Sequence, residues 1–456
     1  MKIHKLEIIC SIEPIRQIAK AFGKDSDLHL VGGCIRDMFL KKIPKDFDFA
    51  TVLAPEVVER RCAAAGIKTV IVGIRRGTIS AIIDGEAYEI TTFRQKGKET
   101  LFSKTIEEDL AARDFTINAI AYNLRTNEIV DPYNGLGDIQ YRILRTVGSA
   151  KERFTEDPHR ILRMCRFAAQ FDCAVSDEQV QCAIDLQDLL ATIEPERINA
   201  ELKKIFVTLP RAALLRCLMY LDDVGFYKIW IPELAACKGV TQNRYHEYDV
   251  YKHTFSVVFN CENYRVKMAA LFHDIGKVQT KTIDENGDVH FYGHEDKSAE
   301  MAEVIMQRLK FSRADMDSII KLIKFHMRPI ECGKKAIRKL KAALENDFEN
   351  WLQLKHADKF FGGTPDVELE KYKKSWATFM DLLHEVEQEE TVHPTAKLAI
   401  NGEVVMKLLD LKPGPEVGVW LDKCKEYVYE YPEKNTIEHL TGFLIATECR
   451  EEQVAS

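Results

Sequence analysis

The pattern of apolar and polar positions changes about a third of the way along the 456-residue chain. In the first 150 or so residues, short apolar or alternating runs bounded by Gly and Asp predict β-strands. These runs are residues 28–31, 68–73, 78–83, 86–93 and 127–133. Between them, residues 54–66 have the pattern of a helix that ends at a glycine. The N-terminal part is therefore expected to be α/β or α+β.

Beyond about Thr155 the spacing of apolar residues becomes helical and strand signals become rare. Clear examples are residues 157–171, 196–206 and 253–260. The chain is too long for one ordinary core, so two to four domains are expected. Turn clusters near Pro210, Gly239 to Asn243 and Glu389 to His393 are candidate boundaries.

The composition is that of a soluble globular protein, with 46% hydrophobic and 30% charged residues. The first residues carry charges every few positions, which predicts neither a signal peptide nor a membrane span. Twelve cysteines are scattered without a C-x-x-C pair, which indicates reduced thiols in a cytoplasmic protein. The net charge of −7 does not exclude a nucleic-acid partner, because Lys and Arg cluster locally.

A glycine pair comes directly after the first predicted strand. Gly32 and Gly33 stand where backbone N–H groups approach phosphate oxygens closely and where a following helix N-terminus favours anions. Arg36, three residues on, is placed to add a charge-assisted bond to a triphosphate. Most glycine pairs are simple turns, so this pair indicates a phosphate site only in combination with neighbouring acidic residues.

Two such acidic residues, Asp46 and Asp48, are separated by one phenylalanine. In a strand, residues i and i+2 face the same side, so both carboxylates are expected to point together while Phe47 and Phe49 pack into the core. Adjacent carboxylates repel unless a cation lies between them, and Mg²⁺ suits oxygen ligands that are completed by phosphates. The alternative is a solvated acidic turn.

The motifs GGCIRD and KDFDFAT resemble the signature of class II tRNA nucleotidyltransferases, within the DNA polymerase β-like superfamily. The likeness continues in the same order through residues 107–123, 131–139, 156–167, 194–206 and 398–418. It therefore covers most of the chain. The resemblance implies Mg²⁺-dependent, template-independent addition of nucleotides to the 3′ end of tRNA.

The resemblance also implies roles for individual residues. Asp46 and Asp48 match catalytic, metal-binding carboxylates, and Glu89 is the candidate third acid, with an exposed strand residue as the alternative. Positions that hold the phosphates and sugar of the nucleotide are matched by Gly33, Arg36 and Arg113, and Asn118 lies in the same motif. For Asn118 the alternative is a residue that caps or braces a turn.

The residues Asp157, Arg160, Arg163 and Arg166 recur every third position, which predicts a stripe on one helix. An Asp and an Arg one turn apart offer an acceptor and a fork of donors. The resemblance implies that this pair reads the base edge of CTP or ATP in place of a template, with Arg163 and Arg166 meeting phosphate or the neighbouring base. The alternative is a solvated basic face.

The segment between Arg94 and Glu107 departs from the family pattern. Enzymes that add the complete CCA usually carry a longer flexible loop there, and this short segment resembles that of enzymes that add only the two cytidines. Residues 72–83 do not resemble the characteristic segment of bacterial poly(A) polymerases, which disfavours polyadenylation. The nucleotides added are therefore open between CCA and CC.

A second constellation, in the order H…HD…H…H…D, resembles the HD superfamily of metal-dependent phosphohydrolases. Its members are His253, His273, Asp274, His294, His326 and Asp358. Neutral imidazoles suit Mn²⁺, Ni²⁺, Fe²⁺ or Zn²⁺, and the carboxylates are suited to bridging two ions. The resemblance implies hydrolysis of phosphate or 2′,3′-cyclic phosphate ends, and a retained but inactive scaffold is the alternative. We assign no role to His246, His290 and His356.

Together these patterns predict an α+β fold: a polymerase β-like head with a small mixed sheet, then an all-α body and tail that include a helical HD domain. The expected domains are a nucleotidyltransferase head at 1–150, a helical base-selecting and RNA-binding neck and body at 151–240, an HD domain at 241–390 and a helical RNA-binding tail at 391–456. The expected partners are tRNA, CTP and ATP, with no membrane. The competing hypothesis is an HD phosphohydrolase with a head that only binds RNA. The sequence does not indicate an oligomeric state.

Overall fold

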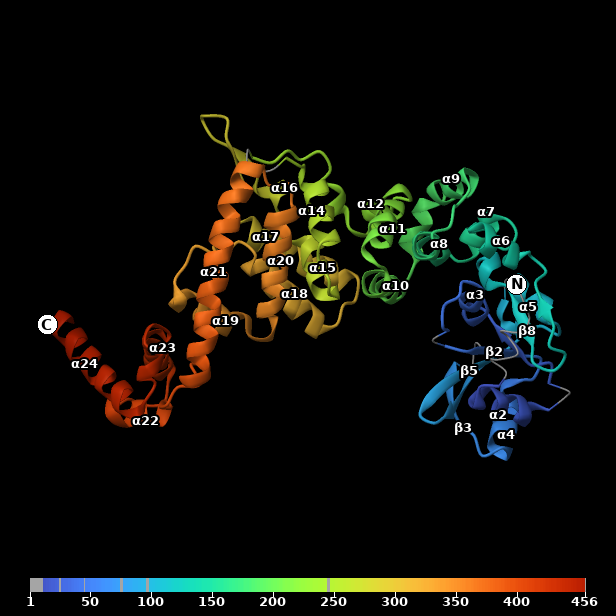
Figure 1. Ribbon diagram of the computed structural model, residues 1–456, viewed down its shortest axis with the longest axis horizontal. Coiled ribbons are helices and arrows are strands. Elements are labelled where there is room, and N and C mark those ends of the chain that lie inside the picture. Colours follow the sequence, from blue (N-terminus) through green and yellow to red (C-terminus); the bar gives the residue numbers. More distant parts are fainter. Residues whose placement is uncertain are drawn as a thin grey trace. The chain divides into compact units, whose positions relative to one another are not determined.

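The structure is a computed structural model that describes residues 11–23, 26–44, 46–73, 77–95, 98–243 and 247–455. The chain divides into two compact units, Met1–Ile231 and Pro232–Ser456. In Figure 1 the strands of the large sheet lie in the first unit, and the second unit is almost entirely helical. Each unit contains buried hydrophobic clusters of its own.

A seven-stranded mixed sheet organises the first unit, with strand order β3-β4-β5-β2-β1-β8-β9. Its strands are β1 (His29–Val31), β2 (Asp48–Thr51), β3 (Lys68–Gly73), β4 (Thr78–Ile83), β5 (Glu86–Thr92), β8 (Ala121–Asn123) and β9 (Ile129–Val130). Strand β2 is antiparallel to β1 and parallel to β5, and the other neighbours are antiparallel. A separate two-stranded hairpin pairs β6 (Arg94–Gln95) with β7 (Lys98–Phe102).

Helices cover this sheet and continue beyond it. Those of the sheet region are α2 (Glu13–Phe22), α3 (Gly33–Phe39), α4 (Pro55–Ala64), α5 (Ile106–Ala111), η2 (Thr116–Asn118) and α6 (Gly135–Tyr141). The later helices are α7 (Ala150–Glu156), α8 (His159–Phe171), α9 (Asp177–Asp185), η3 (Gln187–Thr192), α10 (Pro195–Thr208), α11 (Arg211–Asp223) and α12 (Phe226–Trp230). Helix α4 shows the local reason for its bounds, because Pro55 occupies its first turn and Gly66, with φ of 73°, lies just past its end.

The second unit is a set of packed helices with one small hairpin. Its elements up to the hairpin are α13 (Pro232–Ala235), α14 (Val250–Phe259), α15 (Tyr264–Phe272), α16 (Lys277–Thr280), β10 (Thr282–Ile283) and β11 (Val289–His290). Then come α17 (His294–Arg308), α18 (Arg313–Phe325), α19 (Lys334–Leu344), η4 (Glu345–Asp347), α20 (Phe348–Phe361) and α21 (Asp366–Val392). The chain ends with α22 (Gly402–Leu408), α23 (Pro415–Glu430), η5 (Pro432–Lys434) and α24 (Ile437–Ala455).

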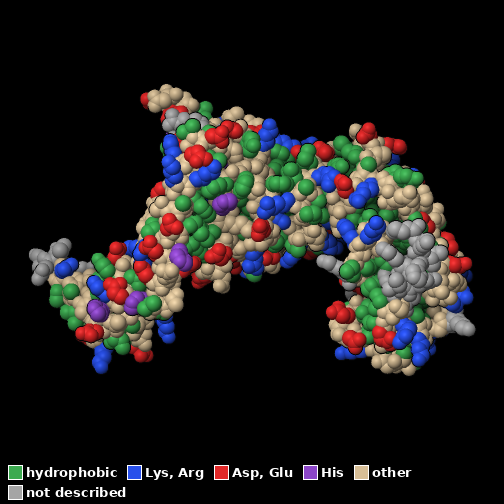
Figure 2. Space-filling model, viewed as in Figure 1, with side chains coloured by type: hydrophobic (Ala, Val, Ile, Leu, Met, Phe, Trp, Pro, Cys, Tyr) green, Lys and Arg blue, Asp and Glu red, His purple; other side chains and the backbone are tan. Residues whose placement is uncertain are grey.

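The helices of the second unit begin where their sequence provides caps. Asp249, Asn263 and Ser312 each accept a hydrogen bond from a backbone N–H in the first turn of α14, α15 and α18. The long helix α21 lies alongside α19 and α20, and α22 to α24 have a hydrophobic core of their own built around Val405, Cys424 and Leu440. Acidic and basic side chains intermingle on the face of this unit seen in Figure 2.

The predicted fold class is confirmed, since a small mixed sheet with helices precedes a helical remainder. The pattern missed two hairpins, β6–β7 and β10–β11, whose strands are short and polar. Throughout the described ranges no helix combines the length and apolar character that crossing a membrane requires. The eleven cysteines within those ranges are free thiols. The three boundaries between the four predicted domains remain predictions.

Candidate active sites

The register of the central strands brings the glycine pair and the aspartates to one edge of the sheet. Val31, at the end of β1, pairs with Asp48, at the start of β2, so Gly32 comes directly beside the Asp48 carboxylate. Strands β2 and β5 run parallel, and Phe49 pairs with Ile90, so Glu89 on β5 lies next to Asp48 on β2. The predicted burial of Phe49 holds, whereas Phe47 is only partly buried.

Asp46 differs from the expectation that both carboxylates belong to one strand. The strand begins only at Asp48, and Asp46 is exposed two residues before it. Burial raises the pKa of the Asp48 carboxyl, and the negative charges of Glu89 and Asp46 raise it further, while Arg113 lowers it. The neighbouring carboxylates therefore destabilise the negative charge of Asp48, which is the electrostatic condition that favours a bound cation.

Gly32 makes room for an arginine. Its φ is 73°, and a Cβ at this position would lie 2.7 Å from Nη1 of Arg113. Arg113 in turn donates to Asp109, 3.1 Å from Nη2 to Oδ2, and Arg94 approaches the other oxygen of the same carboxylate. Burial raises the pKa of Asp109, but the two guanidinium groups lower it by more, so the net shift of the pKa is downward. Two cations are thus held at the sheet edge beside Asp48.

Asp114 is the centre of a buried polar network behind this edge. It accepts from Nε of Arg163 at 2.7 Å and from Nδ2 of Asn118 at 3.1 Å, and Asn118 accepts from Nη1 of Arg36 at 2.6 Å. Although burial acts in the opposite direction, Arg163 and these hydrogen bonds lower the pKa of Asp114 to about 2. The Arg36 guanidinium also lies over the Phe171 ring, at 4.3 Å from its centroid. The predicted residues Arg36, Asn118 and Arg163 are therefore parts of one rigid unit.

The stripe that begins at Asp157 is not on a single helix. Helix α7 ends at Glu156 and α8 begins at His159, so Asp157 lies in the connection, and only the three arginines are on α8. The cause is Pro158, since a residue before proline is driven out of the helical region, and Asp157 has a ψ of 96°. The prediction of a shared helix was wrong on this point.

Asp157 and Arg160 are each fixed by other side chains. Nη2 of Arg197, on α10, donates to Oδ2 of Asp157 at 2.8 Å, and the backbone N–H of His159 donates to Oδ1 at 3.2 Å. Arg160 donates to Glu156 and to the carbonyl of Ala112. Each carboxylate oxygen of Asp157 keeps a second lone pair for a ligand.

A cavity of about 550 Å³ in the first unit connects these groups. Nine of its lining residues were predicted as site residues: Gly32, Gly33, Arg36, Asp48, Arg113, Asn118, Asp157, Arg160 and Arg163. Arg166 does not line it, because its guanidinium is buried in an ion pair with Glu201, 2.6 Å from Nε to Oε1. A direct contact of Arg166 with a nucleotide remains a prediction.

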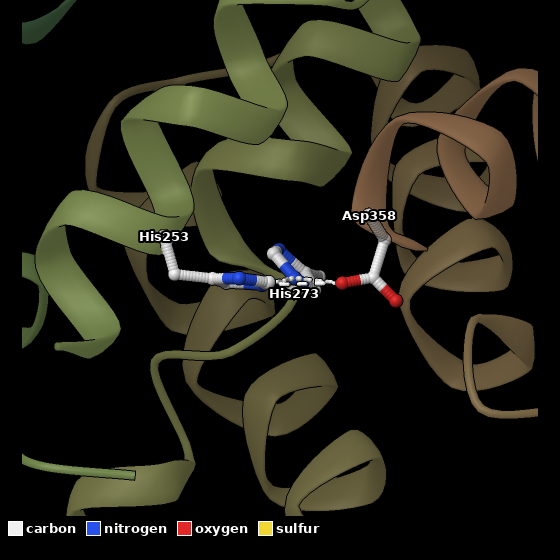
Figure 3. A group of neighbouring side chains, drawn as sticks. All are labelled: His253, His273 and Asp358. Atoms are coloured by element: carbon white, nitrogen blue, oxygen red, sulfur yellow. Dashed lines mark hydrogen bonds and ion pairs between the residues drawn. The ribbon is translucent and has the colours of Figure 1, made fainter. Parts of the chain in front are cut away.

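In the second unit, all six predicted histidines and aspartates come together. His253, His294 and Asp358 lie on α14, α17 and α20, His273 and Asp274 follow the end of α15, and His326 follows the end of α18. Figure 3 shows His253, His273 and Asp358 pointing toward one another. The Nε2 atoms of His253 and His273 are 3.1 Å apart, and those of His294 and His326 are 3.3 Å apart. Within the described part of the chain, the groups whose ligand atoms lie within 4.8 Å of one another are His253–His273–Asp358 and His273–Asp274–His326.

The Nδ1 atoms explain why these rings face inward. Three of them contact the carbonyl three residues earlier: His273 with Ala270 at 2.8 Å, His294 with Phe291 at 2.8 Å and His326 with Ile323 at 2.7 Å. The fourth, that of His253, contacts the carbonyl of Gly362 at 2.7 Å. A carbonyl only accepts, so each Nδ1 carries a proton and each Nε2 faces the centre, where it can bind an ion once it is deprotonated.

Asp274 lies between the two imidazole pairs. Its Oδ2 is 3.1 Å from Nε2 of His253, and its Oδ1 is 3.2 Å from Nε2 of His294. This Oδ1 atom is buried and has no hydrogen-bond partner. An orphaned carboxylate oxygen beside facing imidazole nitrogens is an arrangement that divalent ions satisfy.

The charge of this centre also favours a cation. Burial would lower the pKa of His273, but Asp274 and Asp358 raise it to about 9. Burial and the neighbouring His273 and His294 lower the pKa of His326 well below its usual range. The two carboxylates thus stabilise positive charge at the centre, although not on every ring. The donor set, four imidazoles and two carboxylates, fits a divalent transition metal.

The sequence matches two family models. Residues 28–145 match the poly A polymerase head domain, and residues 250–360 match the HD domain. The chain therefore carries a poly A polymerase head domain and an HD domain. Both belong to families of metal-dependent domains.

Two CCA-adding enzymes are similar to the chain over different lengths. The CCA-adding enzyme of Lactobacillus delbrueckii subsp. bulgaricus is 36% identical over 207 residues, which is 44% of this chain and 50% of that enzyme. This match therefore spans only half the length of the curated relative. The CCA-adding enzyme of Enterococcus faecalis is 26% identical, over 91% of each chain.

Solved structures share the fold along the whole chain. The crystal structure of the Bacillus stearothermophilus CCA-adding enzyme in complex with CTP matches with a TM-score of 0.69 and 25% identity, over 96% of this chain and 97% of that one. A CCA-adding enzyme in complex with ATP matches with a TM-score of 0.64 and 18% identity. The second likeness concerns the fold alone.

Sequence reasoning missed several residues of the head-domain cavity. Arg94, Asp114, His159 and Arg197 all line it. Asp114 and His159 belong to motifs that were recognised, and Arg197 lies in the motif at 194–206. Their contacts join residues far apart in the chain, which a single sequence does not reveal. In the HD domain, the pocket of about 280 Å³ exposes four predicted residues, Asp274, His294, His326 and Asp358.

Proposed function

We propose that the protein transfers CMP and AMP from CTP and ATP to the 3′ end of tRNA, forming or repairing the CCA terminus without a template. The observation that carries this proposal is the head-domain cavity, which joins Asp48 and Gly32 to Asp157 and Arg160. A catalytic carboxylate, a glycine turn and a base-reading pair are thereby combined in one space. The resemblance to CCA-adding enzymes over 91% of the chain supports the same function.

Asp46, Asp48 and Glu89 would hold Mg²⁺, because their mutual repulsion fits a cation. Bound Mg²⁺ supplies orientation of the triphosphate and lowers the pKa of an attacking 3′ hydroxyl. The side chains of Arg113 and Arg94, held by Asp109, are placed to neutralise phosphate charge. Gly32 allows Arg113 to approach the chain closely enough for this role.

Asp157 and Arg160 would select the base. A carboxylate accepts from an exocyclic amine, which cytosine and adenine both carry, and a guanidinium donates to a ring nitrogen or carbonyl. Uracil presents no exocyclic amine, so it leaves Asp157 without its donor. Arg197 holds the side chain of Asp157, and Glu156 holds that of Arg160. A pair held in one geometry discriminates between bases better than a pair that can rotate to suit each of them.

The alternative within this proposal is an enzyme that adds only CC. The short segment between Arg94 and Glu107 favours it. The structure describes that segment as the hairpin β6–β7 and then α5, with residues 96 and 97 outside the described ranges. Incubation with tRNAs that end before CCA, after C or after CC, with each nucleotide alone and in mixture, separates the two. A stop at CC would identify the CC-adding enzyme, and complete CCA would exclude it.

Substitution tests the catalytic assignment. Asp48→Asn should lower nucleotide incorporation at least about 100-fold, the scale of a lost catalytic group. Asp84→Asn is the matched control, because it makes the same charge change in an exposed turn between β4 and β5 of the same sheet. Incorporation that survives Asp48→Asn would contradict the assignment.

A second activity is favoured by the facing imidazoles of the HD domain. We propose that His253, His273, Asp274, His294, His326 and Asp358 hold Mn²⁺, Ni²⁺, Fe²⁺ or Zn²⁺ and that the site hydrolyses phosphate or 2′,3′-cyclic phosphate ends of RNA. Such an ion supplies a nucleophile at neutral pH by lowering the pKa of water. Asp274, with an oxygen facing each imidazole pair, is suited to hold two ions in place. Removing a blocked terminus would prepare the 3′ end of tRNA for nucleotide addition. We place both activities in the cytoplasm.

The two activities are separable by substitution. His273→Ala should abolish hydrolysis of a 2′,3′-cyclic phosphate and spare incorporation, and Asp48→Asn should do the reverse. Loss of both activities in either variant would contradict two independent sites. Hydrolysis with no incorporation in the unmodified protein would favour the competing hypothesis of a phosphohydrolase with an RNA-binding head.

A further inference from the structure

An aromatic pair borders the metal-ligand pocket of the HD domain and has no part in holding the ligands. His290 ends strand β11, Tyr292 lies two residues later, and His294 then begins α17. Both rings line the pocket of about 280 Å³ together with Asp274 and His326. The hairpin β10–β11 therefore carries these rings to the entrance of the site.

The orientation of the two rings is fixed. Their centroids are 5.2 Å apart and their planes differ by 10°. The Tyr292 hydroxyl lies 3.3 Å from Nδ1 of His290, and Nε2 of His290 lies 2.9 Å from Oδ2 of Asp284. With Nε2–H donating to Asp284, Nδ1 accepts from the tyrosine hydroxyl, so one tautomer satisfies both bonds. Asp284 is itself fixed, because its Oδ1 accepts from the backbone of Asn286 and Asp288.

Tyr292 is nonetheless 78% exposed. A tyrosine that serves the core would bury its ring, and one that is merely solvated would not need a chain of hydrogen bonds to hold it. An ordered ring with a free face, beside a metal-ligand pocket, is suited to stack on a flat ligand. Preorganisation reduces the entropy that such binding costs.

The rest of the pocket is suited to a phosphate. Nζ of Lys277 lies 2.7 Å from Oδ2 of Asp274 and 5.5 Å from the centroid of the Phe291 ring. Lys359, also in the lining, forms an ion pair with Asp358. The pocket therefore combines cations and metal ligands, which suit a phosphate, with flat rings, which suit a base.

We propose that His290 and Tyr292 form a stacking platform for the base of a nucleoside phosphoester whose phosphate reaches the metal ligands of the HD domain. The platform rests on the phosphohydrolase function proposed above for the same site. It makes the base, as well as the phosphate, a determinant of which esters are hydrolysed. A phosphoester without a base is correspondingly a poorer substrate.

The test compares two substrates of the full-length protein loaded with Mn²⁺: adenosine 2′,3′-cyclic phosphate and the same cyclic phosphate on a methyl riboside that has no base. The measured quantity is the ratio of their kcat/KM values. Tyr292→Ala should lower this ratio about tenfold, the size expected for loss of one stacked base. Tyr292→Phe, which keeps the ring but loses the hydrogen bond to His290, should lower the ratio less than Tyr292→Ala does. Ile283→Ala is the control, since Ile283 is 65% exposed on the same hairpin and is not part of the pocket lining.

The ratio separates specificity from damage. A misfolded or metal-depleted variant loses activity on both substrates together, so an unchanged ratio in Tyr292→Ala would overturn the platform. If the unmodified protein hydrolyses neither substrate, the phosphohydrolase function fails and binding decides the platform instead. Equilibrium dialysis of adenosine 2′-phosphate should then show about tenfold weaker binding to Tyr292→Ala, and equal binding would overturn the platform as well.

Discussion

Val31 and Asp48 are paired across strands β1 and β2, so the last residue before the glycine turn lies opposite the first carboxylate of the next strand. Side chains alternate along a strand, so this register alone decides that the Asp48 carboxylate lies at the edge where Gly32 begins its turn. Parallel pairing of β2 with β5 adds Glu89 to the same place. The head site is thus built by three strands that are far apart in sequence.

The close approach of Arg113 to Gly32 predicts an effect of Gly32→Ala on catalysis. The new Cβ would overlap Nη1 of Arg113, and alanine at φ of 73° costs about 1–2 kcal/mol of the free energy of unfolding. Gly66→Ala is a matched control, because Gly66 has the same φ of 73° but no atom within 4 Å of the added Cβ. Both variants should lose stability in urea unfolding, Gly32→Ala the more because of the added overlap, and only Gly32→Ala should raise the KM for CTP. Equal KM values would show that Arg113 has no part in binding the nucleotide.

Asp114 predicts a pH dependence of head-domain stability. Its pKa is about 2 in the folded protein against an ordinary value of 3.8, so the folded state favours the ionised form. This contribution, about 2 kcal/mol, is fully present above pH 4 and is lost as pH falls through 2. The advantage of the unmodified protein over Asp114→Asn should therefore shrink between pH 5 and pH 3. Hydrogen exchange of amides in β1 and β2 measures it, and a constant difference would contradict the assignment to Asp114.

The pair of Arg197 and Asp157 predicts a loss of base selection when Arg197 is removed. Arg197→Ala frees the carboxylate to rotate, so discrimination of CTP over UTP, as a ratio of kcat/KM, should fall about tenfold, which corresponds to about 1.4 kcal/mol. Arg197→Lys should restore part of it. The control is Arg216→Ala, which breaks an exposed pair with Asp172 in the same unit. Unchanged discrimination in Arg197→Ala would mean that Asp157 needs no such support.

Gly362 predicts a defect in metal binding. A Cβ there would lie 2.7 Å from Nδ1 of His253 and 2.2 Å from the carbonyl of Asp358, so Gly362→Ala must displace a ligand. Metal analysis of the purified variant should show fewer ions per chain, and added Mn²⁺ should raise its Tm less than it raises that of the unmodified protein. Gly333→Ala, whose added Cβ meets no atom within 4 Å, should behave as the unmodified protein. Full metal content in Gly362→Ala would show that close packing of Gly362 against His253 is not needed for metal binding.

Much of the fold could be predicted because the buried strands and helices leave a regular pattern. Strand β1 is buried at all three positions, and its apolar run is plain in the sequence. The hairpin β6–β7 could not be predicted, since residues 94, 95, 98 and 99 are charged or polar and show no alternation. The hairpin β10–β11 has only two residues in each strand, and its turn is organised by the Asp284 side chain.

The sequence was enough to predict many of the residues that form the candidate sites, but not how most of them are arranged. The order of histidines and aspartates was enough to find six residues that meet in the HD domain. The partner of Asp157 was not predictable, because Arg197 is 40 positions away and only the packing of α10 brings it near. The period-three spacing from Asp157 to Arg166 suggested one helix, and it failed because the constraint that Pro158 places on its neighbour outweighs periodicity.

The Nδ1 contacts of the HD ligands carry a consequence for the order in which the centre assembles. Three imidazoles are oriented by a carbonyl three residues earlier, His273 and His326 at the ends of α15 and α18 and His294 through the turn before α17, so each is set by local structure. His253 is oriented by Gly362, 109 positions later. A chain still emerging from the ribosome therefore has three ligands ready long before the fourth. We therefore expect high affinity for the ion only after the residue that follows α20 packs against His253 on α14, which would make metal capture a late event in the maturation of this domain.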